Sequence, residues 1–351
     1  MSLAQLTIEG VRNLAPVTLR PSSNLNWFQG ENGAGKTSVL EAVYLLARGR
    51  SFRSHRIGSV IQHNQNQLRV VAQRAEDGTM LGMERSSTAW RGRIAGQDCH
   101  RLSEFAARLP LVLIEPDSHR LIDGGPEHRR QHLDWQLFHV EPDYLPIWQR
   151  YSRYLRQRNA ALKSNAETAV LRALEGPMAE AGEKMGRLRA GLVESTTAAV
   201  LDLAEALGVQ LPGEVSLAYR GGYDADAGLA LELEASRARD RELGYTRRGP
   251  HRAELIVQCD GQSAAQELSR GQQKLLAMLL LLAKFGALRS GPTQPLLLLD
   301  DPVSELDRRH FAGVLAWLEG QDTQVWVTST SPCPCPATVF HVEQGRIRPV
   351  V

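Results

Sequence analysis

The chain has 351 residues, 42% hydrophobic and 23% charged, so it can bury a sizeable core. Its 41 Lys and Arg against 39 Asp and Glu leave a formal net charge of +2, too small an excess to imply or exclude a nucleic-acid partner. Its apolar stretches are far shorter than the ~20 residues of a membrane-spanning helix, and no signal peptide is visible. We expect a cytoplasmic protein with no membrane partner.

The first elements in chain order predict a strand, a glycine-rich loop and a helix. Residues 3–9 alternate between polar and apolar, and a second strand at 24–29 leads into the loop. Thr37 then opens a helical stretch that extends to Ala47. Further strands are predicted at 68–74 and 80–95.

The loop itself matches the spacing G-x-x-x-x-G-K-[ST] and reads Gly30-Glu31-Asn32-Gly33-Ala34-Gly35-Lys36-Thr37. Its glycines let backbone N–H groups surround phosphate oxygens, close to the positive end of the helix dipole. Lys36 would reach the β- and γ-phosphates of ATP, and Thr37 would bind Mg²⁺. A chance glycine-rich turn is the alternative, but the strand before the loop and the helix after it favour a phosphate site.

The middle of the chain, from about 126 to 207, changes to a helical pattern. One helix opens near Pro146, and Gly176-Pro177 is a break signal. The next helix carries apolar residues at three- and four-residue steps for about two heptads, which is too short for a long coiled coil.

The strand pattern then resumes, with strands predicted at 215–219, 229–235 and 253–259. We therefore expect a discontinuous ATPase lobe from residues 1–110 and 236–351, and a mainly helical second lobe from residues 111–235.

Two acids follow an apolar run in the last third of the chain. Leu296–Leu299 reads as a central parallel strand, buried on both faces, and Asp300 and Asp301 follow it. Asp300 would hold Mg²⁺, and Asp301 would orient the attacking water. The alternative is an ordinary strand end followed by a helix cap. The presence of a phosphate loop in the same chain favours the magnesium site over this alternative.

Two further motifs flank these acids. Ser269-Arg270-Gly271-Gln272 heads a predicted helix, where a serine and free N–H groups form either an anion site or a simple cap. Ser304-Glu305-Leu306-Asp307 lies just past the acids.

In this order the motifs resemble the ABC ATPase head. The resemblance implies an α/β fold, a mixed sheet around the phosphate loop with a helical second lobe and no long coiled coil. In that family the serine motif of one subunit caps the γ-phosphate held by another, which implies an ATP-dependent homodimer with Ser269 acting in trans. The implied catalytic residues are Lys36, Asp300, Asp301 and Ser269. The implied nucleotide contacts are Gly30, Glu31, Asn32, Gly33, Ala34, Gly35, Lys36, Thr37, Ser269, Gly271, Gln272 and Asp307.

Within this group the chain is similar to the RecF family of bacterial recombination mediators. The resemblance rests on Val11-Arg12-Asn13-Leu14, Gly49–Arg53, Gly125–Arg130, Gln157–Leu162 and Gly249–Arg252. It implies an ATP-dependent protein that binds single-stranded or gapped DNA, acts with RecR and RecO to help RecA load, and serves replication and the SOS response. It also implies a weak DNA-dependent ATPase, because Asp301 stands where most ABC heads carry the longer glutamate.

Two alternatives to this reading stay open. Transporter ATPases place the serine motif much closer to the phosphate loop and carry a histidine where Thr328-Ser329-Thr330 stands. An ATPase switch that acts only through protein partners would bind no DNA. The γ-phosphate sensor is left to Thr328 or Thr330, and the glutamine switch to Glu115-Pro116-Asp117.

Arginine clusters supply the candidate DNA contacts. One follows the first helix and the other lies on the helix after Pro146, where Arg158 also falls. Each cluster alone is as well explained by a solvated surface, but a repair ATPase favours phosphate contacts without base readout. The residues are Arg50, Arg53, Arg56, Arg150, Arg153 and Arg156.

Overall fold

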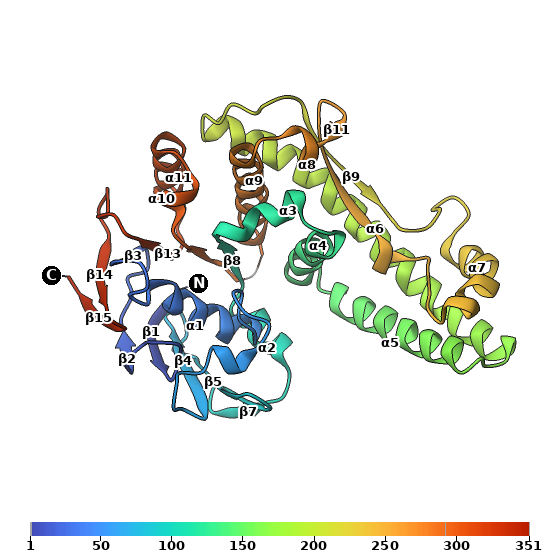
Figure 1. Ribbon diagram of the computed structural model, residues 1–351, viewed down its shortest axis with the longest axis horizontal. Coiled ribbons are helices and arrows are strands. Elements are labelled where there is room, and N and C mark those ends of the chain that lie inside the picture. Colours follow the sequence, from blue (N-terminus) through green and yellow to red (C-terminus); the bar gives the residue numbers. More distant parts are fainter. Residues whose placement is uncertain (1, 292, 351) are drawn as a thin grey trace. The chain divides into compact units, whose positions relative to one another are not determined.

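The computed structural model describes residues 2–291 and 293–350, and the chain forms two compact units (Figure 1). Unit 1 comprises Met1–Ser118, Ala206–Val209 and Leu281–Val351. Unit 2 comprises His119–Glu205 and Gln210–Leu280. Residues 236–280, expected in the ATPase lobe, therefore belong to the helical unit, because the strand that begins at Glu254 pairs with the strand at Val215–Arg220.

The first sheet of unit 1 has the order β15-β14-β3-β13-β12-β8. All of these strands run parallel to their neighbours except β15, which pairs antiparallel with β14. Every residue of β12 and β13 is buried, as the unbroken apolar run of β12 predicts for a central strand. The strands are β3 (Leu25–Gln29), β8 (Leu111–Ile114), β12 (Leu296–Leu299), β13 (Val325–Ser329), β14 (Thr338–Glu343) and β15 (Arg346–Pro349).

The second sheet of unit 1 is antiparallel and has the order β2-β1-β4-β5-β6-β7. Buried and more exposed residues alternate along β1 and β4, which is the pattern of a sheet with one face on a core. Its strands are β1 (Leu3–Glu9), β2 (Val17–Leu19), β4 (Gln67–Arg74), β5 (Met80–Ser86), β6 (Trp90–Ile94) and β7 (Gln97–Cys99).

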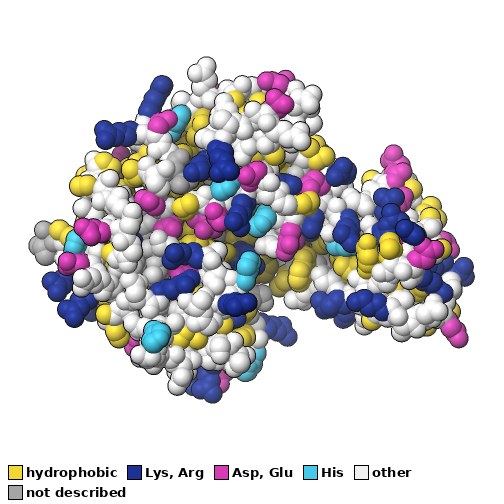
Figure 2. Space-filling model, in the orientation of Figure 1, with side chains coloured by type: hydrophobic (Ala, Val, Ile, Leu, Met, Phe, Trp, Pro, Cys, Tyr) yellow, Lys and Arg dark blue, Asp and Glu magenta, His cyan; other side chains and the backbone are white. Residues whose placement is uncertain are grey.

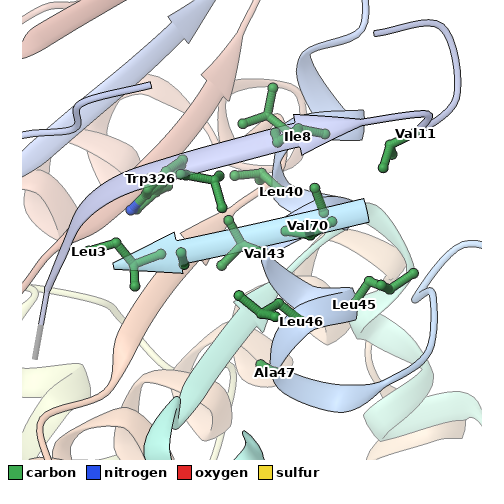
Figure 3. Packing of buried hydrophobic residues seen from close by; sticks show 14 of the residues in the cluster. Leu3, Ile8, Val11, Leu40, Val43, Leu45, Leu46, Ala47, Val70 and Trp326 are labelled. Carbon is green, nitrogen blue, oxygen red and sulfur yellow. The ribbon is translucent and has the colours of Figure 1, made fainter. Parts of the chain in front are cut away.

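Helix α1 (Lys36–Arg48) packs within a single hydrophobic core to which both sheets contribute (Figure 3). Leu40 and Val43 of α1 share this core with Ile8 and Val70 of the antiparallel sheet and with Trp326 of β13. Because the phosphate loop leads directly into α1, this core holds the loop at the carboxyl edge of the parallel sheet. The other helices of unit 1 are η1 (Ile57–Ser59), α2 (Leu102–Arg108), α10 (Pro302–Glu305) and α11 (Arg308–Glu319).

Unit 2 combines helices with a three-stranded antiparallel sheet of order β11-β10-β9. The strands are β9 (Val215–Arg220), β10 (Glu254–Cys259) and β11 (Gln262–Ser263). The helices are α3 (Arg120–Asp123), α4 (Pro126–Val140), α5 (Tyr144–Lys163), α6 (Thr168–Ala206), α7 (Leu229–Leu243), η3 (Pro250–Arg252) and α8 (Ala264–Glu267). Helix α9 (Arg270–Arg289) begins in unit 2 and ends in unit 1, and η2 (Pro116–His119) crosses the first boundary. The last residue of α6, Ala206, is also assigned to unit 1.

Two predictions for unit 2 are wrong. The break signal Gly176-Pro177 lies inside the 39-residue helix α6, although an internal proline costs ~3 kcal/mol. The adjacent Glu175 pairs with Arg158 and Arg237. The predicted strand 229–235 is the start of α7. Its leucines alternate, but Leu229 and Leu233 are buried while Leu231 is exposed, which is helical spacing.

Within the residues that the structure describes, no helix is long and apolar enough to cross a membrane.

Candidate functional site

The glycine-rich loop lies between β3 and α1 and approaches its neighbours too closely for larger residues. The Gly30 N–H donates to the Ser329 carbonyl at 3.3 Å, and a Cβ at Gly30 would lie 2.1 Å from the Val342 carbonyl oxygen. Gly35, which precedes α1, has a φ of 114°, where a side chain would be strained. These glycines are therefore required by the close backbone approach at Gly30 and by the left-handed backbone at Gly35.

Lys36 lies inside this loop. Its Nζ donates to the carbonyl oxygens of Gly30 at 2.8 Å and Glu31 at 2.9 Å, and the side chain is buried. Burial lowers the pKa of Lys36, while the nearby charges of Asp301 and Asp300 raise it. The ammonium therefore sits where a phosphate group held by the loop would meet it.

Thr37 and Asp300, the predicted metal ligands, are in direct contact. Thr37 Oγ1 donates to Asp300 Oδ1 at 2.7 Å, and Thr328 Oγ1 donates to the same oxygen at 2.7 Å. Burial raises the pKa of Asp300, and the two hydroxyl hydrogen bonds lower it. A hydroxyl and a carboxylate are hard oxygen ligands, so this pair fits Mg²⁺.

No group of three or more His, Cys, Asp or Glu side chains suited to a metal occurs among the described residues. A two-ligand protein site is what Mg²⁺ uses when phosphates and water complete its shell.

Asp301 and Thr328 are linked through the backbone. Asp301 has a left-handed φ of 47°, and its N–H donates to Thr328 Oγ1 at 2.9 Å. Thr328 is fully buried, whereas Thr330, the other candidate sensor, is exposed. The Thr328 hydroxyl therefore holds the Asp300 carboxylate and the backbone of Asp301, whereas Thr330 is exposed.

Replacing Thr328 by Val tests this link. The shapes match, but the Asp301 N–H and Asp300 Oδ1 each lose a buried partner, so we expect the free energy of unfolding to fall by about 1–3 kcal/mol. Urea denaturation measures the loss, and Thr330→Val, at an exposed site, serves as the control. Equal stability of the two variants would show that the Thr328 hydroxyl orients neither acid.

A cleft of about 1210 Å³ opens beside the loop. Lys36, Thr37, Asp301 and Thr328 line it on the loop side. The rest of the lining, which we call the second wall, comes from Arg12, Arg53, Ser87 and residues of the segment 58–66, together with Asn13, whose Nδ2 donates to the Gly33 carbonyl of the loop at 3.2 Å. The sequence does not predict this second wall as a whole, although it singles out Arg12 and Asn13 as part of a family motif and Arg53 as a candidate DNA contact.

A buried carboxylate organises that wall. Glu41 on α1 is fully buried and accepts hydrogen bonds from Arg12 at 2.8 and 2.7 Å and from the Ser51 hydroxyl. Ser51 Oγ in turn accepts from the N–H groups of Arg53 and Ser54 at 3.0 and 2.9 Å. This chain of contacts fixes Arg53, a predicted DNA contact, at the cleft that contains Lys36.

The Ser-x-Gly-Gln motif forms the start of α9. The Ser269 N–H donates to Gln272 Oε1 at 2.9 Å, and the Gln272 N–H donates to Ser269 Oγ at 3.4 Å. This is a reciprocal capping box, so the motif does cap α9, as one of its two predicted roles requires. Ser269, Gly271 and Gln272 are all exposed in unit 2, whereas the phosphate loop belongs to unit 1.

Asp307 has a visible structural role. Its side chain accepts from the His310 N–H at 2.9 Å and caps α11, and it pairs with His310 Nδ1 at 2.7 Å. The segment Glu115-Pro116-Asp117 directly follows β8, whose Ile114 carbonyl accepts the Asp300 N–H at 2.8 Å. That segment therefore starts at the same sheet edge as the paired acids.

The candidate DNA arginines fall into different environments. Arg50, Arg56 and Arg156 are exposed, Arg150 pairs with Glu180 at 3.0 Å, and Arg153 lies over the Tyr154 ring at 5.3 Å.

Two arginines outside that set are structural. Arg158 is fully buried between Glu175 and Asp240, so the structure removes it from the basic cluster on α5. Arg129 pairs with Glu254 at 2.7 Å.

Two sheets that share a core with one helix, with a phosphate loop before that helix and paired acids beside it, define an ABC-type ATPase head. Residues 2–334 match the family described as RecF/RecN/SMC N terminal domain. The chain is 41% identical over 363 residues to the DNA replication and repair protein RecF of Xanthomonas axonopodis pv. citri (strain 306), covering 99% of this chain and 98% of that protein. It is 39% identical over 362 residues to RecF of Pseudomonas aeruginosa (strain LESB58), covering 99% and 97%. The chain belongs to the RecF family.

Solved structures share the fold. The recombination mediator protein RecF-ATP of the RecFOR pathway superimposes with a TM-score of 0.89 at 23% identity, covering 99% of this chain and 97% of that one. The Smc head domain of Pyrococcus furiosus, bound to the C-terminal domain of ScpA, gives a TM-score of 0.59 at 16% identity, covering 99% and 95%. The expected fold class and family are thereby confirmed.

Proposed function

We propose that this protein binds ATP and Mg²⁺ in the cleft of unit 1 and uses ATP to control its binding to DNA during recombinational repair. The observation that carries the proposal is the 2.7 Å contact between Thr37 and Asp300 beside the buried Lys36. These groups form a phosphate and metal site from segments more than 260 residues apart, within a chain of the RecF family.

Each group has a role set by its position. The loop N–H groups and Lys36 bind the β- and γ-phosphates, and Thr37 and Asp300 hold Mg²⁺, which neutralises phosphate charge when bound. Asp301 lines the cleft and orients the attacking water, but its carboxylate is one methylene shorter than glutamate, so hydrolysis is slow.

The serine motif completes the site from a second copy of the chain. Ser269, Gly271 and Gln272 are exposed at the start of α9, where the first-turn N–H groups of a helix favour an anion. Two copies then hold two ATP molecules between them, and ATP favours a homodimer.

The biological setting comes from family membership. A solved relative is described as a recombination mediator of the RecFOR pathway, and relatives that match nearly the full chain are named DNA replication and repair proteins. We accordingly propose action with RecR and RecO at single-stranded or gapped DNA, assistance to RecA loading, and a contribution to replication and the SOS response.

Binding to gapped duplex DNA with ATP, with ADP and without nucleotide, across a salt series, tests this function. We expect tight binding with ATP alone, weakening steeply as salt rises because phosphate contacts release counterions. Fluorescence anisotropy of a labelled gapped duplex gives the affinities. Equal binding in all three states would show that ATP does not control DNA binding. No binding in any state would indicate a switch that acts through protein partners.

A further inference from the structure

The loop between α7 and β10 in unit 2, residues 244–253, brings together two motifs that the nucleotide site does not use. It contains Gly249-Pro250-His251-Arg252, and it lies against α5, which carries the segment Gln157–Leu162. We call residues 244–253 the arginine loop.

Buried polar groups hold the inner side of the arginine loop. Asn159 Oδ1 accepts from the Thr246 N–H at 2.8 Å and from the Thr246 hydroxyl at 2.7 Å. Arg158 Nη1 donates to Thr246 Oγ1 at 2.8 Å, and the Arg247 N–H donates to Asp240 at 3.2 Å. Thr246, Arg158 and Asp240 are all almost completely buried, so these bonds are shielded from water.

The second half of the loop is held in the same way. Arg189 Nη1 donates to the Pro250 carbonyl at 2.7 Å, and the Gly249 N–H donates to the Gly222 carbonyl at 3.1 Å. Burial lowers the pKa of His251 to about 4, so its ring is neutral near pH 7. Nε2 then donates to the Thr246 carbonyl at 2.9 Å, and Nδ1 accepts from the Tyr151 hydroxyl at 2.6 Å.

The side chains on the outer side are arginines and one tyrosine. Tyr245 is 40% exposed, Arg247, Arg248 and Arg252 are exposed, and the Arg252 guanidinium lies 5.3 Å from the Tyr245 ring centroid. Arg248 pairs with Glu232 at 3.2 Å, which leaves Arg247 and Arg252 as the stronger positive positions.

Helix α5 extends this surface. Arg156 is exposed and precedes Asn159 by one turn on the same helix face, and Asn159 binds Thr246 of the loop. Figure 2 shows several Lys and Arg side chains, with hydrophobic and some acidic side chains among them, over the part of the molecule where α5 and α7 lie.

The inner contacts account for the conformation of the loop, and the outer side chains contribute nothing to them. Arginines bind phosphates, and an exposed aromatic ring stacks on bases, which is the combination that single-stranded nucleic acid uses. An acidic protein surface would use the arginines but would gain no base stacking from Tyr245. A loop that is already rigid loses little conformational freedom on binding.

We propose that Tyr245, Arg247 and Arg252 of the arginine loop, together with Arg156 of α5, form a preorganised contact surface for single-stranded DNA. The inference rests on the proposed DNA-binding function and assigns part of it to a surface of unit 2.

The test measures binding of a fluorescent oligo(dT) and of a duplex of equal length, with ATP present. Arg247→Ala/Arg252→Ala should weaken binding to oligo(dT) at least tenfold and reduce the slope of log affinity against log salt by about 1.4, since each lost phosphate contact on a single strand removes roughly 0.7. Tyr245→Leu should weaken oligo(dT) binding roughly tenfold with the salt slope unchanged, because stacking releases no counterion. Tyr245→Phe, which keeps the aromatic ring, should retain the wild-type affinity for oligo(dT).

The matched control is Arg172→Ala/Arg239→Ala, which removes two exposed arginines of unit 2 that pair with Glu234 and Glu242. It should leave affinity and salt slope close to wild type, and all variants should keep ATP binding. If the wild-type protein binds DNA and the loop variants bind it equally well, this inference is wrong, but the proposed function still stands. Equal effects of Tyr245→Leu on oligo(dT) and duplex would overturn the stacking role. A wild-type protein that binds no DNA would contradict the proposed function itself.

Discussion

A Lys36→Met variant is expected to bind ATP with an affinity about 100-fold or more below that of the wild type. The Lys36 ammonium is buried in the phosphate loop, where its acceptors are the carbonyls of Gly30 and Glu31. Charged hydrogen bonds to two phosphates contribute about 1.5–3 kcal/mol each, and about 1.4 kcal/mol is a tenfold change in affinity. Met keeps the apolar stem, so the change is confined to the charge. Isothermal titration with ATP and Mg²⁺ measures it.

Lys184→Met is the matched control for this experiment. Lys184 lies on α6 and is exposed beside Glu180, so the same exchange there should leave ATP affinity unchanged. Circular dichroism of both variants checks that the fold is kept. Undiminished ATP affinity of Lys36→Met would overturn the assignment of the loop as the phosphate site.

A Ser269→Arg variant is expected to bind ATP as a monomer and to lose ATP-dependent dimerisation. Ser269 is exposed at the start of α9, and the long cation in its place would fill the space that a second copy must approach. The exchange also removes the capping box, which costs about 1 kcal/mol of local helix stability. Sedimentation analysis with a slowly hydrolysed ATP analogue measures the monomer–dimer equilibrium.

Ser164→Arg is the control for the added charge. Ser164 is an exposed serine just after α5, and we expect its variant to dimerise like wild type. ATP titration of both variants distinguishes a loss of nucleotide binding from a loss of the contact between the two copies of the chain. A Ser269→Arg protein that still dimerises with ATP would show that this motif does not complete the site in trans.

Much of the candidate nucleotide site could be predicted because its signals are local. A strand, a fixed glycine spacing and a helix lie within one short stretch, and the apolar run before Asp300 identifies a central strand without outside information. That Asp300 faces Thr37 followed from both lying at carboxyl ends of parallel strands or just beyond them. The second wall of the cleft carried no such signal, since the segment 58–66 is an irregular polar stretch.

The arginines show most clearly what could not be predicted from the sequence. By sequence, Arg156 and Arg158 are equivalent members of a basic helix, yet one is exposed and the other is fully buried. The difference is made by Asp240, which lies 82 residues further along the chain and supplies the carboxylate at 2.7 Å from Arg158. A buried charge requires a partner, and no local pattern states which distant residue provides it.

The order and spacing of nearby residues were enough to indicate the ATPase class and the family, and to predict the phosphate loop and the paired acids. The tertiary structure alone decided which residues wall the cleft, that α6 continues through Pro177, and which arginines remain available to a ligand. Those outcomes depend on ion pairs and packing between segments far apart in the chain, and such tertiary context routinely overrides local propensity.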